Sequence, residues 1–136
     1  MTCPLCVPVA ETVLWQDEAC RVIAVDDQAF PGFCRVVWSA HVAEMSDLLP
    51  AERQHLLDVV LATEKALRSL MQPDKINLAS LGNLVPHLHW HVIPRFRDDA
   101  NFPDPIWAPV RRDGTGRTAP PGELLAQAIE SSLRET

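Results

Sequence analysis

Residues 87–93 read His-Leu-His-Trp-His-Val-Ile, with a histidine at every second position. Successive side chains of a β-strand point to opposite faces of a sheet, so this period of two predicts a strand. The histidines (His87, His89, His91) then share one face, and the residues between them (Leu88, Trp90, Val92) point into a core. The histidine Cα atoms lie about 6.6 Å apart, so one phosphate can contact more than one ring. The fold must therefore cover one side of this strand and leave the other open.

The rest of the chain supplies the elements for such a sheet. Four more segments rich in Val, Ile and aromatic residues, bounded by turn-forming residues, predict strands at 12–16, 21–25, 33–38 and 76–81. From Pro50 to about Met71, leucines and valines recur at helical spacing and predict one long helix. Pro94 is expected to end the strand of residues 87–93. The prediction is an α+β fold, a five-stranded antiparallel sheet packed against the long helix.

The length of 136 residues suits one compact domain, with a core at about 12–95. Residues 96–136 carry many prolines and glycines and predict an irregular tail that wraps the domain or is mobile. A short amphipathic helix is expected at 122–133. Its apolar stripe would be Leu124, Leu125, Ala128, Ile129 and Leu133.

Charge and hydropathy exclude several classes of partner. The formal net charge of −6 would repel polyanions, so nucleic acid is not expected as a main partner. No apolar run approaches the ~20 residues of a membrane span, and the first residues do not resemble a signal peptide. We therefore expect a cytoplasmic protein. In a reducing compartment, the four cysteines are expected to be thiols or metal ligands.

Histidine suits chemistry on a phosphate, because its ordinary pKa of about 6.5 leaves much of it neutral and nucleophilic at cellular pH. Repulsion among three neighbouring rings is expected to keep at least the central one, His89, neutral. The same alternation also fits three nitrogen ligands of one catalytic zinc ion.

Residues 87–95, His-Leu-His-Trp-His-Val-Ile-Pro-Arg, resemble the signature of the histidine triad (HIT) superfamily of nucleotide hydrolases and transferases. The resemblance runs from about Leu14 to Arg95. It includes an acid at Asp26, a fourth histidine at His41, the long helix, and a Gly-Asn pair at 82–83. The segments 30–34 (Phe-Pro-Gly-Phe-Cys) and 41–45 (His-Val-Ala-Glu-Met) resemble a proteobacterial-type branch.

The resemblance implies hydrolysis or transfer at the α-phosphate of a purine nucleoside phosphate conjugate, such as a phosphoramidate or a dinucleoside polyphosphate. His89 matches the nucleophile, which forms a nucleotidyl-histidine that water releases. His91 matches the histidine whose side chain serves the phosphate and leaving group and whose carbonyl orients the nucleophile. The supporting catalytic pair would be His87 and His41; the substrate-binding residues would be Asp26 for the ribose, and Asn77 and Asn83 for the phosphates. No cofactor is required by this route, and a homodimer is implied.

Two departures from the family pattern bear on specificity. Better-known branches have Gly-Gln-Ser/Thr-Val before the triad, whereas this chain has Gly-Asn-Leu-Val at 82–85. The shorter amide of Asn83 and the apolar Leu84 remove a phosphate or leaving-group contact. The loop at 77–82 is also shorter and less glycine-rich. An alternative from another class is therefore a nucleotide-binding or scaffold protein with little catalysis. A zinc-dependent hydrolase using the triad as ligands is a third reading.

Cys3 and Cys6 form a Cys-x-x-Cys pair. Two thiolates at this spacing can bind zinc, and some histidine triad proteins complete such a site with residues matching His41 and His87. If zinc binds there, these two histidines are structural. Trp107, in the tail, has two interpretations: a base-stacking platform that reaches a neighbouring active site, or an anchor of the tail on the core or on a dimer partner.

Overall fold

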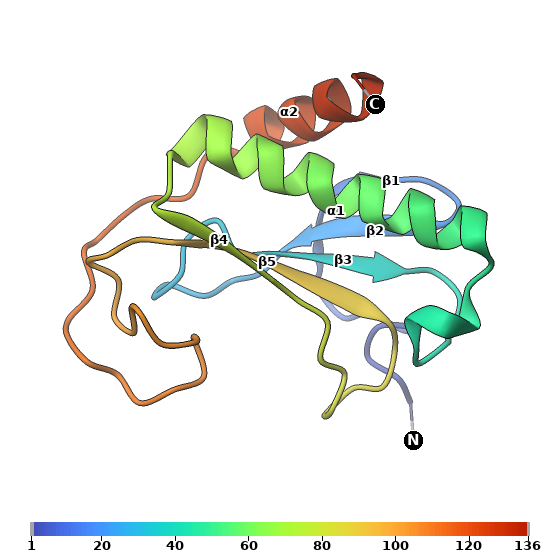
Figure 1. Ribbon diagram of the computed structural model, residues 1–136, viewed down its shortest axis with the longest axis horizontal. Helices are drawn as coiled ribbons and strands as arrows, with labels where there is room; N and C mark the ends of the chain where they lie inside the picture. Colours follow the sequence, from blue (N-terminus) through green and yellow to red (C-terminus); the bar gives the residue numbers. More distant parts are fainter. Residues whose placement is uncertain (1, 136) are drawn as a thin grey trace.

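The computed structural model describes residues 2–135, which form one antiparallel sheet with two helices on one side. The strands are β1 (Thr12–Gln16), β2 (Cys20–Ala24), β3 (Cys34–Trp38), β4 (Lys75–Ala79) and β5 (His89–Arg95). Their order is β1-β2-β3-β5-β4, and every neighbouring pair is antiparallel. Helices α1 (Pro50–Met71) and α2 (Gly122–Arg134) cover one face, and the N-terminal arm and the loops lie toward the other (Figure 1). The predicted α+β fold is confirmed.

Helix α1 has the bounds that its periodicity predicts, and a short 3-10 helix (Met45–Asp47) precedes it. Pro50 begins the helix, where a missing N–H has no intrahelical partner to lose. The backbone N–H of Leu49 donates to the Glu52 carboxylate at 2.7 Å. Gln72 ends the helix in the left-handed region, at φ 52°. The buried residues form the stripe that faces the sheet: Leu56, Val59, Val60, Ala62, Thr63, Ala66 and Leu67.

The main core lies between this stripe, the helix-facing side of the sheet, and α2. Leu125 and Ile129 anchor α2 there, and the helix packs against α1 and β1. Leu124, predicted as part of the apolar stripe, is instead 47% exposed. The other predicted stripe residues reach the core, since Ala128 and Leu133 pack against it beside Leu125 and Ile129.

The bounds of β5 differ from the prediction at both ends. The strand begins at His89, so His87 precedes it, and it continues through Pro94 to Arg95. Pairing of β5 with β3 ends at Val92, so β4 is the only neighbouring strand beside Pro94. A residue without an N–H is tolerated where one side of the strand is unpaired. The expectation that Pro94 ends the strand is therefore wrong.

The tail is held in place although residues 96–121 contain no helix or strand. The Asp99 carboxylate accepts hydrogen bonds from the Arg95 guanidinium at 2.8 and 3.0 Å and from the backbone N–H groups of Phe96, Asn101 and Phe102. Both charged side chains are almost fully buried. Of the two expectations for the tail, wrapping describes it.

A smaller apolar cluster of Phe30, Phe33 and Ile93 lies on the sheet face opposite the helices. Ile106 of the tail packs against it, whereas Trp107 is 62% exposed and does not anchor the tail on the core. Within residues 2–135, no helix combines the length and apolar character that crossing a membrane requires.

Candidate active site

His89 and His91 project from β5 on the face opposite the helices. Their ring centroids are 5.0 Å apart, and the planes meet at 74°. The His91 ring also lies 5.6 Å from that of Phe33. The intervening Trp90 is half-buried against the helix-side core, as the alternation predicts, and its indole N–H donates to the Met45 sulfur. The sequence correctly places these two histidines on one face.

A backbone contact fixes the tautomer of His89. Its Nδ1 lies 2.6 Å from the carbonyl oxygen of His87. A carbonyl only accepts, so Nδ1 carries the proton and Nε2 keeps its lone pair. The expectation that the His91 carbonyl orients this ring is wrong, because His87, just outside the strand, turns its own carbonyl to the ring.

The two rings are held neutral. Burial lowers the pKa of His89, and the charges of Arg35 and His87 lower it further, against the hydrogen bond with the His87 backbone. Burial also lowers the pKa of His91 to about 4, helped by the charges of His89 and Arg35. The lowered pKa of His89 favours the neutral form that the sequence predicts, with burial and not repulsion among the rings as its largest cause.

Both rings line a cavity of about 440 Å3. The loop at 81–85 forms one side, including Asn83, which was predicted to contact phosphate. The other wall comes from Pro4 and Leu5 of the N-terminal arm and from Arg35 of β3. Arg21 holds the arm in place, since it donates to the Leu5 carbonyl at 2.9 Å. The cavity is therefore assembled from segments far apart in the sequence.

The other predicted substrate-binding residues lie outside the lining of this cavity. The Asn77 amide oxygen, on β4, accepts from Arg95 at 2.9 Å, so its NH2 group is the one left to donate. Asp26 follows β2, is exposed, and makes no hydrogen bond or ion pair with another described residue. Its neighbour Asp27 is half-buried, and its negative charge attracts the Arg35 guanidinium.

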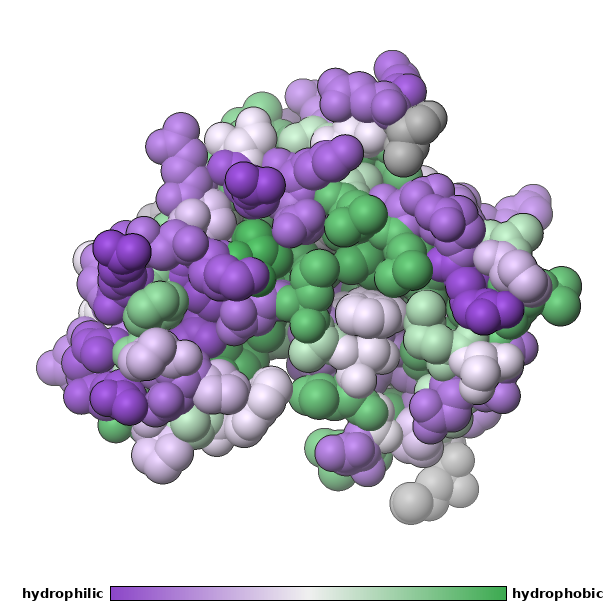
Figure 2. All heavy atoms as spheres, viewed as in Figure 1, coloured by the Kyte–Doolittle hydropathy of each residue, from purple (hydrophilic) through white to green (hydrophobic). Residues whose placement is uncertain are grey.

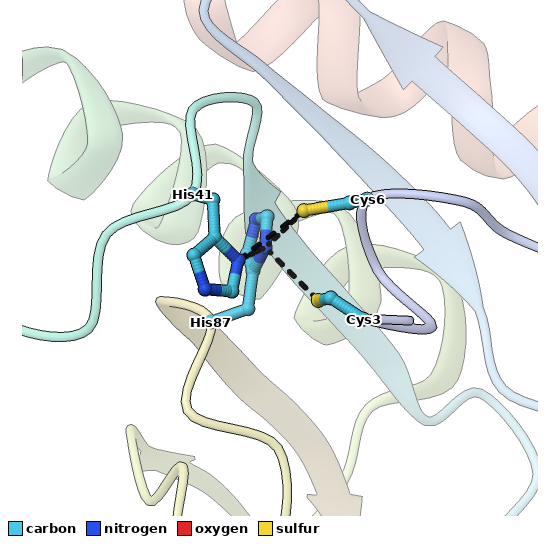
Figure 3. A group of neighbouring side chains, drawn as sticks. All are labelled: Cys3, Cys6, His41 and His87. Carbon is cyan, nitrogen blue, oxygen red and sulfur yellow. Dashed lines mark hydrogen bonds between the residues drawn. The ribbon is translucent and has the colours of Figure 1, made fainter. Parts of the chain in front are cut away.

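The four residues predicted to bind zinc come together beside this cavity (Figure 3). The sulfur of Cys3 lies 3.4 Å from Nδ1 of His87, and the sulfur of Cys6 lies 3.4 and 3.2 Å from Nδ1 of His87 and His41. The two Nδ1 atoms are 3.1 Å apart. A tetrahedral zinc with bonds of about 2.0 Å to nitrogen and 2.3 Å to sulfur requires nitrogen–nitrogen and nitrogen–sulfur separations of about 3.3–3.5 Å. The donor set fits that ion.

The orientation of His87 agrees with a ligand role. Its Nε2 lies 2.6 Å from the Trp38 carbonyl oxygen, so Nε2 carries the proton and the Nδ1 lone pair faces the thiols. Neither His87 nor His41 lines the cavity beside His91. His55, in α1, is partly exposed and pairs with Asp17 at 2.7 Å.

Arg35 and the N-terminal arm were missed as parts of the cavity. The sequence does indicate Arg35, because it is the one charged residue among the apolar residues of 33–38. Nothing in the sequence indicates that Pro4 and Leu5 contact the cavity, since that contact depends on how the arm folds back.

A family model described as the HIT domain matches residues 8–98 of this chain. AP-4-A phosphorylase from Mycobacterium tuberculosis is 32% identical over 78 residues, 53% of this chain and 40% of that protein. The asymmetrical bis(5'-nucleosyl)-tetraphosphatase of Schizosaccharomyces pombe is 22% identical over 111 residues, 78% of this chain and 61% of that protein. The chain thus spans less than two thirds of either relative.

Solved structures match over nearly the whole chain. A histidine triad protein from Bradyrhizobium japonicum has a TM-score of 0.68 at 28% identity, covering 92% of this chain and 89% of that one. A Zn-bound histidine triad family protein from Mycobacterium smegmatis has a TM-score of 0.61 at 19% identity, covering 96% and 89%. At that identity, the second match shows a shared fold.

Proposed function

Because the chain belongs to the HIT domain family, we propose that it is a nucleotide hydrolase or nucleotidyl transferase whose nucleophile is His89. One observation supports the proposal most directly: the His89 ring lines a cavity, its pKa is lowered by burial, and its Nδ1 is hydrogen-bonded to the His87 carbonyl oxygen. The relatives named for dinucleoside tetraphosphate chemistry support a substrate with a phosphate chain.

In the proposed reaction, Nε2 of His89 attacks the α-phosphorus of a purine nucleoside phosphate conjugate. A nitrogen–phosphorus bond forms as the bond from phosphorus to the leaving group breaks. Water then attacks the same phosphorus and loses a proton to solvent, and the nitrogen–phosphorus bond breaks, which releases the nucleoside monophosphate and returns the lone pair to His89. The leaving group is an amine for a phosphoramidate, which takes up a proton from solvent as it departs, and a phosphate chain for a dinucleoside polyphosphate.

We assign the supporting roles as follows. His91 serves the phosphate and the leaving group, since its ring lies beside that of His89. Asn83 donates to phosphate oxygens from the cavity wall, and Asn77 does so through the NH2 group that Arg95 leaves free. Asp26 binds the ribose hydroxyls. His41 and His87 act mainly by holding the arm and, through the His87 carbonyl, the nucleophile.

The test is the variant His89→Ala, assayed with diadenosine tetraphosphate and with adenosine phosphoramidate, with His55→Ala as a matched control on the surface. We expect His89→Ala to lose turnover of whichever substrate the wild type hydrolyses, while still binding AMP. His55→Ala should keep the wild-type rate. Unchanged turnover in His89→Ala would exclude this nucleophile.

A second candidate function is nucleotide binding without efficient catalysis. The observation that favours it is Leu84, which is 92% exposed where better-known branches carry a hydroxyl. A binding protein would bind AMP but hydrolyse neither conjugate. A zinc hydrolase using the triad finds less support, because His87 faces the thiols and the described metal-competent clusters contain neither His89 nor His91.

We propose that Cys3, Cys6, His41 and His87 hold a structural zinc ion. The support is the close approach of their four ligand atoms, all within 4.8 Å of one another, and the fold shared with a Zn-bound protein. Metal analysis should find one zinc per chain after dialysis against zinc, and Cys6→Ser should lose it. Zinc retained by Cys6→Ser, or none retained by the wild type, would refute the site.

We also propose a homodimer formed through β4, which is an edge strand of the sheet. Figure 2 shows hydrophobic side chains gathered near the centre of the face on which α1 lies above β4 in Figure 1. Leu61 and Leu78 are 44% and 38% exposed on these elements. An unpaired strand edge beside apolar surface favours pairing with a second copy. Light scattering should give a dimer for the wild type and a monomer for Leu78→Lys; a monomeric wild type would contradict this.

A cytoplasmic location is part of the same proposal. All four cysteines are free, and a reducing compartment keeps thiols available as metal ligands. Localisation of a tagged protein by cell fractionation would test it.

A further inference from the structure

Arg35 occupies a central position on the face of the sheet that carries the histidines. In the registers of β2, β3 and β5, Arg35 lies opposite Ile23 on one side and His91 on the other. It is thus the cross-strand neighbour of one active-site histidine, and it lines the same cavity as His89 and His91. Directly opposed residues in antiparallel strands have Cβ atoms about 5 Å apart, so the guanidinium and the His91 ring face one space.

The guanidinium has no partner that explains its position. Its Nε is enclosed and unpaired, and the Arg35 side chain makes no hydrogen bond or ion pair with any residue in 2–135. The contacts it does have are the Phe33 ring, 5.4 Å from its central carbon, and the longer-range attraction of Asp27. Arginine at a structural position usually donates to a carboxylate or carbonyl, as Arg21 and Arg95 do here. An enclosed donor without an acceptor is costly unless a ligand supplies one.

Arg35 also carries the charge of the site. Arg35 is the one arginine or lysine among the residues that line the cavity, where it lies with His89 and His91. Arginine itself remains protonated at any cellular pH. The fixed positive charge next to the nucleophile is therefore on Arg35, although the whole chain has a net charge of −6.

A phosphate group meets all of these requirements. Its oxygens accept two parallel hydrogen bonds from the planar guanidinium, and its charge offsets the half-buried cation. The residues that line the cavity include no hydroxyl side chain that could donate to a phosphate. We propose that Arg35 binds the substrate phosphate in this site and makes the cavity selective for nucleotides over nucleosides. The inference rests on the proposed function and names a residue that the family resemblance does not assign.

The test compares AMP and adenosine as ligands, because the two differ only in the phosphate. Binding to the zinc-loaded wild type, Arg35→Met and Arg35→Lys is measured by titration calorimetry, with Arg53→Met on the exposed side of α1 as a control that removes the same charge. Loss of a charge-assisted bond of this kind lowers affinity by about 10- to 100-fold. We expect that loss for AMP in Arg35→Met and a smaller loss in Arg35→Lys, with adenosine binding within about twofold of wild type. Arg53→Met should bind both as the wild type does.

Each failure has its own signature. If Arg35 only shapes the sheet, Arg35→Met weakens AMP and adenosine equally, and the lysine variant gives no selective recovery of AMP binding. If AMP preference survives in Arg35→Met, Arg35 is not the phosphate ligand and the proposed function stands. If the wild type binds AMP no better than adenosine, the nucleotide function itself fails. Should Arg35→Met not fold, the ratio of AMP to adenosine affinity in Arg35→Lys distinguishes the same outcomes.

Discussion

Replacing Asp99 with asparagine should remove a large, pH-dependent part of the free energy of unfolding. Burial alone would raise the pKa of Asp99, but hydrogen bonds from Arg95 and from three backbone amides outweigh it and lower the pKa to about 2, from an ordinary 3.8. At about 1.36 kcal/mol for each pH unit, this difference stabilises the folded protein by about 2.4 kcal/mol at pH 7. Asp99 is 5% exposed, so solvent screens little of it.

The sign follows from linkage. A lowered pKa means that the unfolded state binds the proton first, so the contribution is complete above about pH 5 and is lost as the pH falls toward 2. At pH 3 about 1.3 kcal/mol of it remains. In Asp99→Asn, the buried Arg95 cation also loses its carboxylate partner, which adds to the loss of stability. The total cost of breaking a buried ion pair of this kind is about 3–5 kcal/mol.

Urea denaturation of wild type, Asp99→Asn and the exposed control Asp113→Asn, at pH 7 and pH 3, tests this. The gap between wild type and Asp99→Asn should narrow by about 1 kcal/mol at the lower pH. Asp113→Asn should match the wild type at pH 7. A gap that is below about 1 kcal/mol at pH 7, or that does not narrow at pH 3, would show that the ionised Asp99 carboxylate does not stabilise the fold in this way.

Three further outcomes are expected from packing. Gly32 has a φ of +88°, and an added Cβ would collide with the Met71 side chain. Gly32→Ala should therefore lower the free energy of unfolding, measured by urea denaturation, by about 1–3 kcal/mol, and a loss below about 0.5 kcal/mol would contradict this prediction. Leu56 is fully buried in α1, and Leu56→Ala should cost about 2–5 kcal/mol in the same assay, with no loss counting against the packing described. Burial raises the pKa of Cys20 and of Cys34 to about 12, so iodoacetamide should modify at most two of the four thiols in the native metal-free protein; modification of all four before unfolding would show that these two are accessible.

The sequence predicts most of the fold because the core-facing residues follow simple periods. The helix of residues 50–71 and the strand at 12–16 have the predicted bounds, since prolines and turn residues mark their ends. The alternation around His89 places it and His91 on the open face of the sheet. Strand ends were less predictable, because they depend on which neighbouring strands are present. At Pro94, β3 no longer pairs with β5, and β5 continues beside β4 alone.

The parts of the site that depend on contacts between distant segments were not predictable from local patterns. The cavity wall of Pro4 and Leu5 exists because Arg21 holds the arm from β2. His87 leaves the strand and orients the nucleophile with its carbonyl, a role that side-chain alternation cannot indicate. The position of Arg35 beside His91 is seen only when the register of β3 with β5 is known. The cluster of Cys3 with His87 was anticipated because the resemblance suggested which distant histidines complete a short cysteine pair.

The proposed mechanism requires that His89 form a covalent bond to the nucleotide. Protein mixed with an adenosine-labelled conjugate and quenched in alkali after milliseconds should carry one nucleoside monophosphate per active chain. Peptide mapping should locate that label on residue 89, and His91→Ala should accumulate the label if the water step is slowed. Turnover that continues with no labelled chain at any quench time, or a label on another residue, would exclude a covalent step at His89.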